Sequence, residues 1–193
     1  GGRLLVDCLL AQGVDTAFGV PGESFLAVLD AFHDVTDELR FVICRQEGGA
    51  AFMAEAYGKL TGRPGSCFVT RGPGATNASI GVHTAMQDST PMVLFVGQVG
   101  MGHRGLEAFQ EIEYRSFFDD IAKWVVEIES PDDIPAAVER AFQAGANGLI
   151  VGEMGIANTT ASSAMLAALL GVPAAQMVGA GTGIDSTQQA HKA

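Results

Sequence analysis

Short apolar runs alternate with amphipathic stretches along the first three quarters of the chain. Each apolar run has four to six residues and predicts a buried strand. The predicted strands are residues 16–20, 40–44, 66–70, 92–96 and 123–128. Apolar residues at helical spacing predict helices at residues 4–10, 25–32, 50–60, 77–86 and 132–144. Uninterrupted apolar strands separated by helices are typical of an α/β fold in which helices flank both faces of a parallel sheet.

Two of the helix ends carry their own signals. Gly13 follows the first helix as a C′ residue, where glycine accepts the left-handed backbone that ends many helices. Ser130 is a candidate cap for the last helix, with Pro131 at its first helical position. Both signals support the helix ends that the apolar spacing predicts.

Four loops are expected to hold the functional residues. Ligands of open α/β sheets bind outside the carboxyl ends of the strands. In this chain the corresponding loops are residues 19–22, 45–49, 71–77 and 97–105. All four are rich in glycine or polar residues, which agrees with such a role.

The composition changes sharply near residues 144–146. Residues 1–144 hold 10 of the 11 basic and 20 of the 22 acidic residues, whereas the remainder is rich in Ala, Gly, Thr and Ser. We therefore predict two parts of different origin, residues 1–144 and residues 145–193. The second part is expected to be a short strand–loop–helix fragment, with its elements at residues 148–151, 152–158 and 159–170.

The acidic balance of the chain excludes several partners. The formal net charge is −11 at pH 7, so no basic surface for nucleic acid and no polybasic segment for an anionic membrane is expected. The cysteines Cys8, Cys44 and Cys67 are scattered and form no C-x-x-C pair, which favours a reducing cytoplasm over a disulfide scaffold or zinc ribbon. The four histidines lack metal-ligand spacing, so we expect no metal site in the chain itself.

Glu47 is the first candidate for chemistry. It comes directly after a predicted buried strand, and two glycines separate it from the next predicted helix. A carboxylate there lies at the mouth of the sheet and near a helix N-terminus, which favours negative charge. Partial burial would favour the protonated form instead, as a general acid or base requires. The alternative is a carboxylate that only stabilises the start of the helix.

Two glycine-rich turns are the next candidates. Residues 70–77 read as a strand end, a tight Gly-Pro-Gly turn and a helix start, and glycines let the backbone approach a flat or anionic ligand. Residues 152–160 follow a predicted strand and open a helix, an arrangement that suits a phosphate. In both places the alternative is an ordinary capped helix start.

Five ordered motifs in residues 1–144 identify a family resemblance. They are residues 19–22, 45–54, 72–77, 88–93 and 107–112. Together they closely resemble the N-terminal, pyrimidine-binding (Pyr) domain of thiamine diphosphate-dependent enzymes of the acetolactate synthase-like group. The resemblance implies a Pyr-type sheet and a role for Glu47. In such enzymes the matching glutamate hydrogen-bonds the aminopyrimidine ring of the cofactor and promotes its imino tautomer.

The same resemblance implies further site residues. The cofactor cleft would be lined by Pro21, Gly22, Gly74 and Asn77. The pair Phe109 and Gln110 would lie near the reacting centre, with Phe109 against the cofactor and Gln110 in a catalytic role. Gln46 stands where many relatives have His.

Residues 145–193 resemble a fragment of another family, nicotinate-nucleotide–dimethylbenzimidazole phosphoribosyltransferase of cobalamin lower-ligand assembly. The resemblance is carried by residues 152–160 and 181–185 and extends to Lys192. It implies that the first of these loops approaches a nucleotide phosphate. The implied site residues are Glu153, Gly155, Asn158, Thr159 and Lys192. Ala157 replaces a family glycine, and Ala180 stands where a basic residue is usual.

The expected function is therefore thiamine diphosphate-dependent chemistry on 2-keto acids. Such enzymes bind the diphosphate and Mg²⁺ with a separate domain that carries a G-D-G…N motif, which does not occur in these 193 residues. We expect the chain to bind only the pyrimidine half, to need Mg²⁺ only with a partner domain, and to be inactive alone. The expected partner is a second copy or a diphosphate-binding domain. The alternatives are a phosphoribosyltransferase-like nucleotide-binding fragment and a non-catalytic fused or truncated chain.

Overall fold

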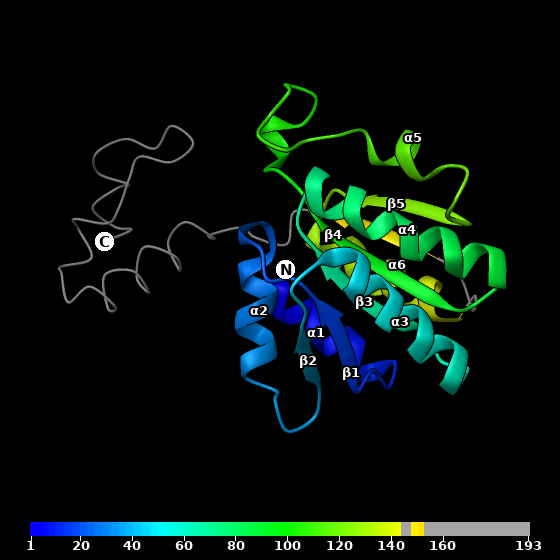
Figure 1. Cartoon of the computed structure of the whole chain (residues 1–193). Helices are drawn as coiled ribbons and strands as arrows, with labels where there is room; N and C mark the ends of the chain where they lie inside the picture. Colours follow the sequence, from blue (N-terminus) through cyan, green and yellow to red (C-terminus); the bar gives the residue numbers. More distant parts are fainter. Residues whose placement is uncertain (144–147, 153–193) are drawn as a thin grey trace. The chain divides into compact units, whose positions relative to one another are not determined.

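A six-stranded parallel sheet forms the centre of the described part of the chain (Figure 1). The computed structural model describes residues 1–143 and 148–152. The strands are β1 Thr16–Gly19, β2 Arg40–Ile43, β3 Gly65–Val69, β4 Met92–Gly97, β5 Trp124–Ile128 and β6 Gly148–Gly152. Their order across the sheet is β2-β1-β3-β4-β6-β5, and every neighbouring pair is parallel. The predicted α/β class is thus confirmed.

Six α-helices and three short 3₁₀ helices are assigned in the described residues. The α-helices are α1 Gly2–Ala11, α2 Leu26–His33, α3 Glu47–Thr61, α4 Gly72–Asp88, α5 Tyr114–Phe118 and α6 Ile134–Gln143. The 3₁₀ helices are η1 Glu23–Phe25, η2 Met101–His103 and η3 Pro131–Asp133. The short helix α5 and the turn η2 were not predicted, because neither is long enough to show a helical period of apolar residues.

The sheet separates two apolar cores. On one face α1, α2 and α6 bury their apolar side chains against alternate residues of β3 and β4, among them Phe68 and Phe95. These two rings stack at a centroid distance of 4.4 Å. On the other face α3, α4 and α5 cover Cys67, Val69 and Leu94. Successive strand residues point to opposite faces, so both central strands are buried on both sides and read as unbroken apolar runs.

The local helix signals are confirmed. Gly13 has φ of +76° just after α1. Ser130 caps η3 in a reciprocal capping box with Asp133, and Pro131 occupies the first turn. The chain then passes from η3 directly into α6.

The helices α3 and α4 begin well before their predicted starts at residues 50 and 77. The predicted Gly-Pro-Gly turn is the first turn of α4, which starts at Gly72 with Pro73 in its first turn. Proline is tolerated there because the first turn has no intrahelical partner for its missing N–H. Likewise α3 starts at Glu47 itself. Both differences bring helix N-termini directly to the carboxyl edge of the sheet.

β6 lies between β4 and β5. It pairs with both in register, so that Gly152 is opposite Gly97 on one side and Ile128 on the other. The backbone N–H of Gln98 extends the pairing by donating to the carbonyl of Gly152 at 3.1 Å. The strand predicted at residues 148–151 therefore belongs to the same sheet as β1–β5. The boundary of origin near residue 144 stays a prediction, and the turn and helix predicted at 152–158 and 159–170 reach beyond the described residues.

Candidate functional site at the carboxyl edge of the sheet

Glu47 and Asn77 form the centre of the candidate site. Glu47 is half-buried at the first position of α3, where the helix N-terminus stabilises its carboxylate. Asn77 on α4 donates a hydrogen bond from Nδ2 to Glu47 Oε2 at 2.9 Å. Within the described part of the chain, Glu47 Oε1 accepts no hydrogen bond, so it is available to an N–H group of a ligand.

Two glycines allow this pairing by letting α3 and α4 approach closely. A Cβ atom on Gly81 of α4 would lie 2.5 Å from Ala51 Cβ of α3. A Cβ atom on Gly48 would lie 3.2 Å from the carbonyl oxygen of Asn77. Larger residues at either position would separate the helices, and with them the carboxylate from the amide.

Gln46 acts as the N-cap of α3. Its Oε1 accepts a hydrogen bond from the backbone N–H of Gly49 at 2.8 Å. The amide is thus turned back toward the helix start, where it satisfies one of the free N–H groups. Gln46 therefore fixes the turn from which Glu47 projects.

A second cluster joins the loop after β1 to the turn after β3. Ser24 Oγ and Thr70 Oγ1 are hydrogen-bonded at 2.9 Å. A Cβ atom on Gly22 would lie 2.8 Å from Thr70 Cβ, and one on Gly74 would lie 3.0 Å from Thr70 Cγ2. The predicted cleft residues Gly22 and Gly74 thus pack around one threonine, and Pro21 precedes them as an exposed residue.

Arg71 lies between three loops. It is the N-cap residue of α4 and forms an ion pair with Glu23 of η1. Its guanidinium carbon lies 5.8 Å from the centre of the Phe109 ring, within the range of a cation–π contact. Its side chain is only 12% exposed, so this cation is held in a largely desolvated position.

The loop after β4 is attached to the same turn. The carbonyl of Gln110 accepts a hydrogen bond from the backbone N–H of Gly72 at 2.8 Å, and a Cβ atom on Gly72 would lie 2.7 Å from that oxygen. Phe109 is 73% exposed beside Arg71. The predicted pair Phe109 and Gln110 therefore lies beside the N-terminus of α4, which also carries Gly74 and Asn77.

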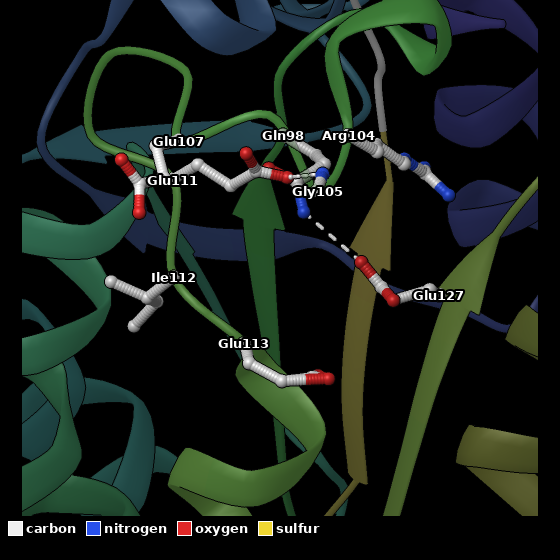
Figure 2. Close-up of a pocket in the computed structure, with 8 residues that line it drawn as sticks. All are labelled: Gln98, Arg104, Gly105, Glu107, Glu111, Ile112, Glu113 and Glu127. Carbon is white, nitrogen blue, oxygen red and sulfur yellow. Dashed lines mark hydrogen bonds between the residues drawn. The ribbon is translucent and has the colours of Figure 1, made fainter.

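An acidic pocket of about 300 Å³ lies behind this loop, at the carboxyl ends of β4 and β5. Figure 2 shows Gln98 Nε2 donating to Glu127 Oε1 at 3.0 Å across it. The carboxylate of Glu111 is directed along its own loop toward Gly105, and Glu113 caps α5. Three of the pocket carboxylates are thus already hydrogen-bonded within the chain. No group of three or more His, Cys, Asp or Glu side chains among the described residues is arranged to hold a metal ion.

Two buried groups near the site have raised pKa values. Burial is the main cause for the Cys67 thiol, and the charges of Cys44 and Glu47 raise its pKa further. Burial also raises the pKa of Tyr114, against the opposing effect of Arg71 and with the added effect of Glu127 and Glu111. Both groups are therefore neutral at pH 7, and neither is a nucleophile or base there.

The structure groups the predicted residues of the first part around the start of α4, with Glu47 opposite on α3. The predicted residues Glu153, Gly155, Asn158, Thr159 and Lys192 lie outside the described residues. Sequence reasoning did not single out Arg71, Thr70 or the capping role of Gln46. A charged residue between a buried strand and a glycine-rich turn was the one available signal for Arg71.

The chain matches two known families. Residues 1–118 match the thiamine pyrophosphate enzyme family, N-terminal TPP binding domain, thiamine pyrophosphate being another name for thiamine diphosphate. Residues 135–193 match the phosphoribosyltransferase family. Both resemblances drawn from the sequence are thus confirmed.

Several curated relatives are acetolactate synthases. The acetolactate synthase of Bacillus subtilis is 41% identical over 148 residues, which is 77% of this chain and 26% of the relative. The mitochondrial catalytic subunit of Saccharomyces cerevisiae is 39% identical over 77% of this chain and 21% of its own length. The isozyme 2 large subunit of Escherichia coli is 37% identical over 77% of this chain and 27% of its own length. The chain thus spans about a quarter of these relatives, and it belongs to the thiamine pyrophosphate enzyme family through an N-terminal TPP-binding domain of the acetolactate synthase-like kind.

Proposed function

We propose that the chain binds the pyrimidine half of thiamine diphosphate through Glu47, with Gly74, Asn77, Phe109 and Gln110 around it. The observation that carries the proposal is the half-buried Glu47 carboxylate, which has one oxygen held by Asn77 and, among the described residues, no hydrogen bond to the other. A carboxyl group can give a proton to a pyrimidine nitrogen, and the resulting carboxylate oxygen then accepts a hydrogen bond from the protonated ring nitrogen. Glu47 would therefore orient the ring and exchange a proton with it.

Three glycines bring together the loops around the proposed cofactor cleft. A Cβ atom on Gly22 or Gly74 would meet the side chain of Thr70, and one on Gly72 would meet the carbonyl of Gln110, so these residues allow the close packing of the loops that carry the site. When bound, thiamine diphosphate supplies a thiazolium carbon that adds to the carbonyl of a 2-keto acid. Phe109 and Gln110 would border the substrate side of that cleft. The reaction of the acetolactate synthase type would then need a separate domain for the diphosphate and Mg²⁺.

Calorimetric titration with thiamine diphosphate and Mg²⁺ tests this proposal. We expect saturable binding to the unaltered chain and its loss in Glu47→Gln, because the amide lacks the negative charge that the ring N–H prefers. Glu38→Gln is the matched control, since Glu38 is exposed in the turn before β2 and should leave binding unchanged. Equal binding by Glu47→Gln and the unaltered chain would contradict the proposal. Absence of binding by all three would favour a non-catalytic chain.

We also propose that α3 and α4 pair with a second copy of the chain. Phe52 and Met53 on α3 are 41% and 42% exposed, and Ile80 on the neighbouring α4 is 54% exposed. An apolar surface on two packed helices suits a two-fold interface, which joins the same surface of both copies. Sedimentation should then show a dimer that Ile80→Glu dissociates. A chain that remains monomeric at high concentration contradicts this proposal and leaves the diphosphate-binding domain as the expected partner.

The phosphoribosyltransferase match supports a second candidate function. Residues 145–193 would bind the phosphate of a nucleotide of cobalamin assembly through the loop at 152–159 and Lys192. Titration with nicotinate mononucleotide tests it, with weaker binding expected for Glu153→Ala. Unchanged affinity in that variant would leave the loop as a helix start without a ligand.

We propose a reducing compartment, such as the cytoplasm, as the location of the protein. All three cysteines are free thiols, and Cys44 and Cys67 are buried. Thiol titration of the unfolded chain should find three reactive groups without prior reduction, and fewer would contradict the proposal. None of the helices in the described part is both long and apolar enough to cross a membrane.

A further inference from the structure

The loop between β4 and α5 holds two residues in an unfavourable backbone conformation. Glu107 has φ of +54° and Gln110 has φ of +66°, a region that residues other than glycine seldom adopt. They lie on either side of Phe109, whose ring is 73% exposed. A strained backbone that presents an exposed aromatic ring needs compensating contacts, and such strain gathers at functional sites.

Glu111 supplies those contacts. Its Oε1 accepts a hydrogen bond from the backbone N–H of Gly105 at 2.7 Å, and its Oε2 accepts one from Ala108 at 3.1 Å. Its own N–H donates to the carbonyl of Ala108 at 2.9 Å. Figure 2 shows this carboxylate turned back over its own loop, away from Ile112. One side chain therefore closes the turn that includes Glu107 and Phe109.

The far side of the turn is fixed to the rest of the site. The carbonyl of Gln110 is held by the Gly72 N–H at 2.8 Å, and the Phe109 ring lies against Arg71. Glu111 on one side and Gly72 on the other thus determine where Phe109 and Gln110 lie relative to α4. Removing either contact would free both residues, because the backbone between them is strained.

We propose that Glu111 is a positioning residue that holds Phe109 and Gln110 in place for a flat heteroaromatic ligand. The inference rests on the proposed function, in which that ligand is the pyrimidine ring of thiamine diphosphate. Glu111 itself contacts no ligand and acts through the loop. A preordered aromatic side chain loses little conformational freedom when a ring binds beside it, which favours affinity.

Three variants test the proposal. Glu111→Ala removes both acceptors, Glu111→Gln keeps one amide oxygen, and Glu113→Gln changes a neighbouring glutamate whose contact is with α5. In Glu111→Ala we expect the Gly105 and Ala108 amides to exchange hydrogen at least about tenfold faster. Its affinity for thiamine diphosphate should fall by about tenfold. Glu111→Gln should recover part of both effects, and Glu113→Gln should show neither.

Two results would overturn the proposal. One is unchanged exchange of Gly105 and Ala108 in Glu111→Ala, which would mean that the carboxylate does not order the loop. The other is faster exchange with unchanged affinity, which would mean that the ordered loop does not serve the ligand. If the unaltered chain binds no thiamine diphosphate, the proposed function fails with the ligand role of Glu111, and the exchange rates alone then decide whether Glu111 orders the loop.

Discussion

The two halves of the sheet match different families, although their strands pair continuously. The strands β2, β1, β3 and β4 all lie within the residues that match the thiamine pyrophosphate enzyme family. On the other side, β6 lies within the residues that match the phosphoribosyltransferase family, and it separates β4 from β5. The register nevertheless runs unbroken from Gly97 through Gly152 to Ile128. A strand can thus pair with its neighbours in this sheet although its sequence matches a different family.

The two halves also differ in burial and in the predicted site residues that they carry. Every residue of β3 and β4 is buried, whereas β5 is mostly half-buried. The predicted thiamine-site residues in the described part all follow the strands β1 to β4. The half made of β2, β1, β3 and β4 therefore carries the proposed site, and β6 and β5 extend the sheet that supports the loop after β4. The predictions below separate these two roles.

Loss of a central ring should have the largest effect. Phe68 on β3 and Phe95 on β4 are fully buried, and their rings stack on each other. Phe68→Ala should lower the free energy of unfolding by about 3–5 kcal/mol, because it removes a buried ring and leaves a cavity. Urea unfolding followed by circular dichroism measures this. Trp124→Ala on the half-buried β5 should lower the free energy of unfolding by clearly less. An equal or larger loss there would contradict the view that β3 and β4 contribute more to stability than β5.

A proline in β6 should come next. β6 has a neighbour on each side, so the N–H of Ile150 belongs to one ladder or the other. Ile150→Pro should destabilise the chain by about 2–3 kcal/mol and expose the amides of β5 and β6 to hydrogen exchange. Proline has no N–H, so a carbonyl of the neighbouring strand loses its hydrogen bond and β6 cannot pair fully. Ile150→Val keeps the N–H and is the control. A proline variant as stable as the control would show that the pairing of β6 contributes nothing.

The sequence predicts the strands better than it predicts the helix start and the contacts around the candidate site. The run Met92–Val96 lies within β4 because a doubly buried strand leaves an unbroken apolar signal. The start of α4 was missed because Gly72, Pro73 and Gly74 are typical turn residues, and only tertiary packing brings them into a helix. The hydrogen bond between Glu47 and Asn77 has no local signal at all. It depends on the close approach of two helices at Gly81, which lies far from Glu47 in sequence.

Widening that approach should have an intermediate effect. Gly81→Ala places a Cβ 2.5 Å from Ala51 Cβ, so α3 and α4 must move apart. We expect a loss of about 1–2 kcal/mol in stability from overpacking, together with weaker binding of thiamine diphosphate as Asn77 moves away from Glu47. Ser79→Ala, on the same helix, is the control. A lower stability with unchanged affinity for thiamine diphosphate would show that the spacing of α3 and α4 does not control the proposed site.

The smallest effect should come from an ion pair at the amino ends of β1 and β3, the edge of the sheet opposite the candidate site. Asp15 precedes β1 and accepts hydrogen bonds from Arg63, which precedes β3, and from Tyr57. The hydrogen bond from Arg63 is the main reason why the pKa of Asp15 is lowered, with burial opposing it.

A carboxyl group with a lowered folded-state pKa stabilises the fold above its unfolded pKa, and this contribution is lost as the pH falls through the folded value. Because the pair is half exposed, Asp15→Asn should cost only about 0.2–1 kcal/mol at pH 7. In urea unfolding the difference from the unaltered chain should shrink below about pH 4, and a difference that grows there would mean that the carboxylate does not stabilise this edge.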